Sequence, residues 1–73
     1  MSMSLKELRQ AGRDHLMEQN EDGFTILRRD QDDASEFNAF ARAAINSLGE
    51  DFIAFPQPDG DGGYVGLFII PLI

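Results

Sequence analysis

The single histidine of the chain is the first residue to consider for acid-base chemistry. His15 directly follows Asp14 and precedes Glu18 by three residues, and a histidine near carboxylates is a common general acid or base. On a helix, however, both carboxylates point away from the apolar stripe to which His15 belongs. No serine, cysteine or lysine stands at a spacing that marks a nucleophile. We therefore expect His15 to lie at the edge of the core with a hydrogen bond, and we expect no catalytic residue and no enzymatic activity.

The segment from Asp59 to Gly63 is the second candidate site, because its alternating aspartates can present carboxylates to a hard cation such as Ca²⁺. The EF-hand pattern also needs a glycine at its sixth position and a glutamate at its twelfth, where this chain has Tyr64 and Ile70. The glycines do not form a dinucleotide-binding fingerprint, because Val65 stands where the third glycine belongs. We predict a hairpin turn here, with no metal ion and no cofactor.

Basic side chains form a third candidate site, for nucleic acid. Lys6, Arg9 and Arg13 share one flank of the first predicted helix, and Arg28 and Arg29 end the first predicted strand. The net charge of −7 opposes binding of a phosphate backbone, and no strand interleaves aromatic with basic residues. We therefore expect these cations to pair with acidic groups of the same chain or of a second copy.

The acidic residues are concentrated in the second part of the chain. Residues 31–73 carry Arg42 alone against seven acids, whereas residues 1–30 are nearly balanced. Such an excess of carboxylates suits a basic protein partner. We predict that this partner binds the acidic connector, which we define as Asp30, Asp32, Asp33 and Glu36.

Length and composition limit the structure that positions these residues. The chain has 73 residues, of which 42 % are hydrophobic and 26 % charged, so we expect one small folded domain spanning residues 1–73. It has no cysteine, which excludes disulfides and thiolate metal sites. The longest apolar run is ten residues, Tyr64 to Ile73, about half of what a membrane-spanning helix needs. The first residues lack the apolar region of a secretory signal, so we expect a cytoplasmic protein without membrane contact.

Capping patterns predict where two helices begin. Ser4 is followed three residues later by Glu7, which places the start of the first helix at Leu5. Apolar residues then recur every three or four positions and predict a helix that ends near Asn20. Within this stripe, Gly12 marks a position where another backbone comes close.

The second helix has the clearest periodicity in the chain. Asp33 precedes Glu36 by three residues, as expected for an N-cap. The apolar spacing that follows predicts a helix from Ala34 to Leu48, with Gly49 as its natural end.

Three apolar runs predict strands at 24–27, 52–55 and 64–70, with a hairpin loop at 56–63. Pro56 suits a sheet edge, and the last run is apolar on both faces, as in a central strand. The expected fold is therefore a small α+β domain, α-β-α-β-β, whose three-stranded, mainly antiparallel sheet has the order 1-3-2. A winged-helix-like arrangement is the alternative, although no basic recognition helix is evident.

Two helices on one face of such a sheet leave apolar side chains uncovered on the other. Each of these large side chains left in water forgoes roughly 1.5–3 kcal/mol. We therefore predict a homodimer whose interface includes Phe68, Ile70 and Leu72. The function that we expect is that of a small acidic protein-protein interaction or regulatory module, with a winged-helix-like nucleic-acid-binding regulator as the alternative.

Overall fold

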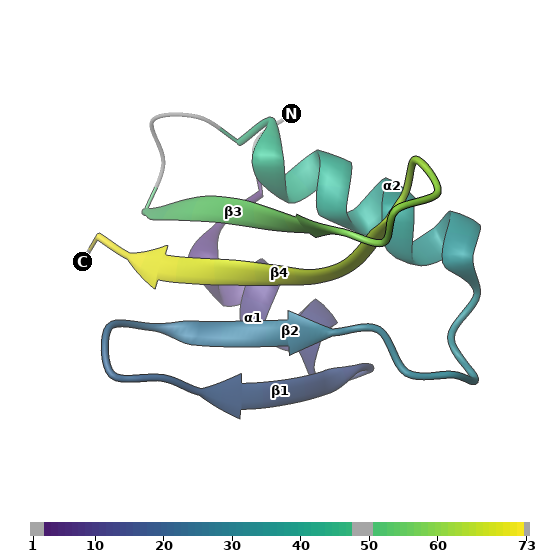
Figure 1. The fold of residues 1–73 in the computed structure, drawn as a ribbon. Coiled ribbons are helices and arrows are strands. Elements are labelled where there is room, and N and C mark those ends of the chain that lie inside the picture. The colour runs from purple at the N-terminus through teal and green to yellow at the C-terminus, as the bar shows by residue number, and fades with distance from the viewer. Residues whose placement is uncertain (1–2, 48–50, 73) are drawn as a thin grey trace.

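The fold is a four-stranded antiparallel sheet with two helices packed on one face (Figure 1). The computed structural model describes residues 3–47 and 51–72. In chain order the elements are α1 (Leu5–Gly12), β1 (Leu16–Gln19), β2 (Phe24–Leu27), α2 (Ala34–Ile45), β3 (Phe52–Pro58) and β4 (Tyr64–Pro71). The strand order in space is β1-β2-β4-β3, and every neighbouring pair is antiparallel.

The predicted α+β class and antiparallel sheet are confirmed, but the prediction of three strands was wrong. The sheet has a fourth strand, β1, which pairs with the outer side of β2. The three strands that we did predict are β2, β3 and β4, and β4 lies between the other two and antiparallel to both. The winged-helix alternative does not describe this topology, since a hairpin, and not a second helix, follows α1.

Both helices begin where the capping patterns placed them. The Ser4 hydroxyl accepts a hydrogen bond from the backbone N–H of Glu7 (3.1 Å) at the start of α1. At α2, the Asp33 carboxylate accepts from the backbone N–H of Glu36 (3.1 Å). α2 ends at Ile45 with Asn46 as its C-cap, so the predicted helix is too long, and Leu48 and Gly49 themselves lie outside the described residues.

The prediction that the first helix reaches Asn20 was wrong, because α1 ends at Gly12. Residues 16–19 form β1 instead, with Leu16 opposite Leu27 and Gln19 opposite Phe24. The segment at 20–23, predicted to end a helix, is therefore a hairpin turn, in which the Asn20 N–H donates to the Gly23 carbonyl (2.8 Å). Pairing with β2 is an interaction that helical spacing does not reveal, and it overrides the helical periodicity of a short segment.

β3 extends three residues further than predicted, so the following loop covers only 59–63. β3 is an edge strand, as Pro56 suggested. The Leu72 N–H donates to the Asp51 carbonyl (2.6 Å), and by antiparallel alternation the backbone positions of Pro56 and Pro58 then face the free edge. Prolines are tolerated there because they remove no ladder hydrogen bond.

The core lies between the sheet and the two helices. β2, β3 and β4 contribute alternate side chains from one face, and each helix contributes its apolar stripe. The buried apolar residues are Leu5, Leu8, Phe24, Ile26, Phe37, Ala41, Ala44, Phe52, Leu67 and Ile69. A single small core of this kind supplies only a few kcal/mol of net stability.

Gly12 permits a close approach, but by side chains and not by the backbone that we expected. A Cβ at Gly12 would lie 2.8 Å from Cδ1 of Ile26 and 3.2 Å from Sδ of Met17. α1 therefore rests directly on the β1–β2 hairpin at this position.

We predict that Gly12→Ala lowers the free energy of unfolding by about 1–3 kcal/mol, because overpacking outweighs the gain in helix propensity. Ile26→Val alone should cost about 0.5–1.5 kcal/mol. The double variant should be more stable than the sum of the two losses predicts, since valine lacks the Cδ1 atom that clashes. Urea titrations of all four proteins measure this coupling, and strict additivity would contradict it.

Candidate functional site

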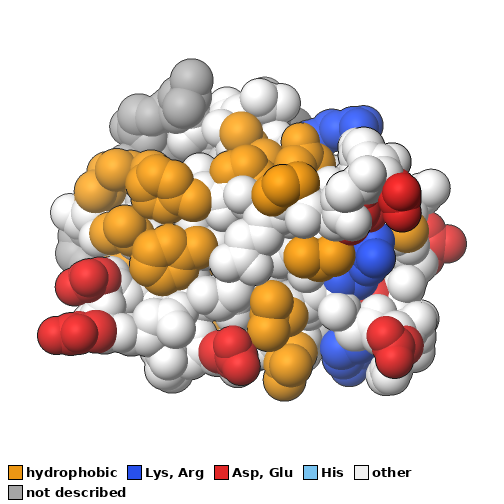
Figure 2. All heavy atoms as spheres, in the orientation of Figure 1, with side chains coloured by type: hydrophobic (Ala, Val, Ile, Leu, Met, Phe, Trp, Pro, Cys, Tyr) orange, Lys and Arg blue, Asp and Glu red, His pale blue; other side chains and the backbone are white. Residues whose placement is uncertain are grey.

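The face of the sheet opposite the helices carries large apolar side chains that no element among residues 3–47 and 51–72 covers (Figure 2). Cross-strand pairs place Ile53 beside Ile70 and Phe55 beside Phe68, and Leu16 beside Leu27. We call this surface the open face and define it by Leu16, Leu27, Ile53, Phe55, Phe68, Ile70 and Leu72. Four of its side chains are 44–54 % exposed, namely Leu16, Ile53, Phe55 and Leu72.

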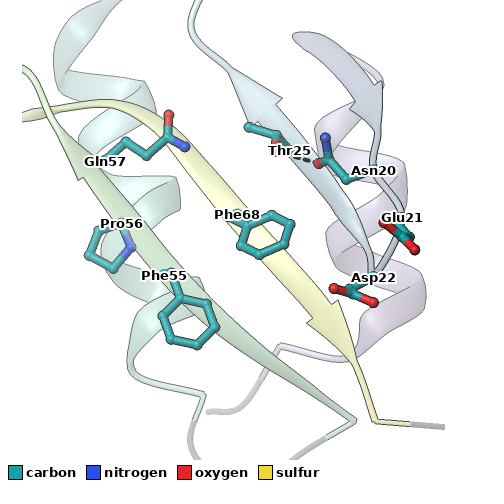
Figure 3. Close-up of a pocket in the computed structure, with 8 residues that line it drawn as sticks. All are labelled: Asn20, Glu21, Asp22, Thr25, Phe55, Pro56, Gln57 and Phe68. Carbon is teal, nitrogen blue, oxygen red and sulfur yellow. Dashed lines mark hydrogen bonds between the residues drawn. The ribbon is translucent and has the colours of Figure 1, made fainter.

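A groove of about 440 Å³ crosses the open face (Figure 3). Its floor is the aromatic pair Phe55 and Phe68, whose rings stack with centroids 6.1 Å apart. The tip of the β1–β2 hairpin forms one rim and brings the carboxylates of Glu21 and Asp22 to it. The full lining is Asn20, Glu21, Asp22, Thr25, Phe55, Pro56, Gln57 and Phe68.

Polar groups near the floor of the groove are fixed within the chain. The Thr25 hydroxyl donates to Oδ1 of Asn20 (2.7 Å). Thr25 as a whole is only 7 % exposed. This bond ties β2 to the hairpin turn and leaves the aromatic rings as the accessible floor. An apolar floor with carboxylates and amides at its rim has the composition of a protein-binding surface, with an apolar centre and a polar edge.

The predicted dimer residues Phe68, Ile70 and Leu72 come together on the open face, from β4 and the residue after it. Sequence analysis missed Phe55 and Ile53 of β3 and Leu16 of β1. The run 52–55 is apolar at every position, as β4 is, and this two-sided apolar pattern was the signal that Ile53 and Phe55 could share the face of Phe68. No comparable signal existed for Leu16, whose segment we assigned to a helix.

The structure does not present the four residues of the acidic connector equally. Asp30 and Glu36 are exposed, and Asp33 caps α2. The Asp32 side chain is only 8 % exposed and accepts hydrogen bonds from the Arg29 backbone N–H (2.7 Å) and guanidinium (2.9 Å). Asp32 is therefore occupied within the chain, and Asp30 and Glu36 are the connector residues that a partner can reach.

His15 also contacts Asp32, at the corner between α1 and β1, so His15, Asp32 and Arg29 form one polar cluster. Its Nδ1 lies 2.9 Å from Oδ2 of Asp32, and its ring packs edge-on against Phe37 with centroids 5.0 Å apart. The expectation of a core-edge histidine with a hydrogen bond is confirmed, although His15 lies after the helix. Arg29 also donates to the Asp14 carbonyl, so the cluster links three segments of the chain.

The loop at 59–63 is a hairpin turn, as predicted, closed by its own backbone. Oδ1 of Asp59 accepts from the N–H groups of Asp61 (2.7 Å) and Gly63 (3.1 Å). These bonds, with that from Asp61 first, lower the pKa of Asp59. Arg28 lies 3.6 Å from the same carboxylate, so Arg28 and Arg29 both pair within the chain, as expected. Within residues 3–47 and 51–72, no group of three metal-ligating side chains is close enough to hold an ion.

Asp32 gives the fold a testable dependence on pH. The hydrogen bonds from the Arg29 side chain, then from its backbone N–H, hold the pKa of Asp32 well below its ordinary value of 3.8. A carboxylate whose pKa is lower in the folded protein than in the unfolded chain stabilises the fold at any pH above its pKa in the unfolded chain. This stabilisation is lost as the pH falls below about 4.

We therefore expect Asp32→Asn to lower the urea midpoint at neutral pH and to reduce its fall between about pH 5 and pH 2.5. Asp30→Asn is the matched control, because it removes the same charge from an exposed position of the same connector. Equal pH dependence in wild type and Asp32→Asn would contradict the role assigned to Asp32.

Comparison with known protein families, curated proteins and solved structures gives no match, so the function has to be inferred from the geometry above.

Proposed function

We propose that this chain is a protein-interaction module that works as a homodimer, with the open face of the sheet buried between the two copies. The observation that carries the proposal is the one-sided packing of the helices, which leaves Phe55, Ile53 and Leu16 between 44 and 49 % exposed on the same face. Soluble monomers rarely expose a contiguous apolar surface of this kind without a binding role.

The energetics favour covering this face. Full burial of one large apolar side chain contributes roughly 1.5–3 kcal/mol. In a twofold interface the same side chain is buried in both copies, so each position contributes twice. A domain of this size has only a few kcal/mol of its own. Burial of the open face would therefore add a stabilisation comparable to that of the whole monomer.

A dimer through the open face leaves the charges at the rim of the groove in solvent. The carboxylates of Glu21 and Asp22 lie at the rim of the groove and not on its floor. They can stay hydrated while the rings are buried.

Contact through the sheet face is favoured over contact through a sheet edge. The free edge of β3 lacks donors at Pro56 and Pro58, and β1 is only four residues long and carries Glu18. Short strands, prolines and charges are the features that suppress edge-to-edge pairing. By the strand register Glu18 lies on the open face at its β1 side, whereas the pair Phe55 and Phe68 on β3 and β4 has no charged residue between its rings.

A basic protein partner would bind a different surface of this dimer. Glu36 lies in the first turn of α2, on the helix side of the sheet, and Asp30 lies in the loop before it. Dimerisation through the open face leaves both carboxylates in solvent. We do not propose the nucleic-acid-binding alternative, because Arg28 and Arg29 are paired within the chain and the net charge is −7.

Sedimentation equilibrium tests the proposal directly. At micromolar concentration we expect a mass of twice the 8.1 kDa of the chain. Phe55→Lys should raise the dimer dissociation constant at least about 100-fold, because the loss of roughly 1.5–3 kcal/mol per aromatic ring occurs twice. Ala39→Lys is the matched control, at an exposed position of α2, and it should leave the dissociation constant unchanged. A wild-type mass of one chain would overturn the proposal.

A further inference from the structure

A second groove lies along α1 and has the opposite charge character. Its volume is about 360 Å³, and its lining residues are Leu5, Lys6, Arg9, Gln10, Arg13 and Asp51. Lys6, Arg9 and Arg13 recur at spacings of three and four, so they line one flank of the helix. Half of the cations of an acidic chain therefore meet at this groove.

These three cations differ from the arginines of β2 and its connector. Arg28 and Arg29 each pair with a carboxylate. In contrast, none of the three lies within 4.0 Å of a carboxylate oxygen among residues 3–47 and 51–72. Among the lining residues, Asp51 supplies a carboxylate against three cations, so the groove keeps an excess of positive charge.

The remaining contacts hold the groove in shape. The Arg9 guanidinium lies 4.7 Å from the centroid of the Phe24 ring, which fixes it over the core. At the helix start, Oδ2 of Asp51 accepts from the Leu5 N–H (3.3 Å), so this carboxylate is directed at the positive end of α1. Arg13 and Lys6 are exposed and can turn toward a ligand.

We propose that this groove binds a short acidic peptide segment of a partner protein, with its carboxylates on Lys6 and Arg13. α1 has eight residues and is about 12 Å long, which an extended peptide of about four residues spans. This inference goes beyond the proposed homodimer and does not depend on it, because α1 lies on the side of the sheet away from the open face.

Charge complementarity favours a short peptide over nucleic acid. Glu7 and Asp14 are exposed on and just after the same helix, beside the flank that carries the three cations, and they repel an anion that extends beyond the groove. The net charge of −7 repels every further negative charge, so a ligand that carries only a few charges is favoured. An acidic segment of a few residues makes its contacts within the groove and avoids these carboxylates.

Fluorescence anisotropy with a labelled hexapeptide of four glutamates and two glycines tests the inference. We expect saturable binding that weakens as salt is raised. The double variant Lys6→Gln, Arg13→Gln should weaken binding by about fivefold to tenfold, as expected for two exposed ion pairs. The matched control is Arg42→Gln, which removes a cation from the exposed side of α2 and should change the affinity less than twofold.

Three outcomes would overturn the inference: no binding of the peptide at low salt, equal affinity in the double variant and in Arg42→Gln, or tighter binding of a single-stranded RNA hexamer than of the peptide. Circular dichroism confirms that each variant is folded. Because Phe55 is remote from α1, Phe55→Lys should bind the peptide as the wild type does, even where it no longer dimerises. This variant therefore separates the inference from the proposed dimer.

Discussion

The structure depends on a geometric limit: this chain has enough helix to cover one face of its sheet. α1 and α2 have 8 and 12 residues, so they are about 12 and 18 Å long and each about 10 Å in diameter. Side by side they span about 20 Å, close to the width of four strands spaced about 4.8 Å apart. The second face therefore has no cover within the described residues, although β3 and β4 carry apolar side chains on both faces.

A partly buried polar cluster sets how far that second face extends. Asp32 bonds to Arg29 and His15 at once, and Arg29 reaches the Asp14 carbonyl. These bonds turn the chain after α1 and direct it back along β2 as β1. β1 then adds Leu16 to the open face, opposite Leu27. Hydrogen bonds to a charged carboxylate are stronger than neutral ones, so a few side chains fix a strand that has little local preference to form.

The difference between local interactions and interactions across the fold explains which elements the sequence predicts. Helix starts at Leu5 and Ala34 follow from caps three residues apart, and a cap is a local interaction. The order of β2, β4 and β3 follows from the two-sided apolar pattern of β4. β1 is not predictable in this way, because it exists through its pairing with β2 and through the Asp32 cluster, which joins His15 to a residue 17 positions away. Of the two aromatic residues on the floor of the groove, the sequence predicts only Phe68 as an interface residue. Phe55 was not predicted, because β3 was given no role in the interface.

The open face and the groove along α1 differ in chemistry and lie on opposite sides of the sheet. The open face is apolar, and a twofold contact through it would place the helix layers on the two outer sides of a dimer. Each outer side would then display one copy of the groove along α1 and one of the exposed connector residues Asp30 and Glu36. A pair of weak, charge-based contacts gains affinity when two copies are held on one scaffold, because the second contact forms at high effective concentration. Apolar burial at the centre would thus supply stability, and weak polar surfaces outside would gain binding strength from being present twice.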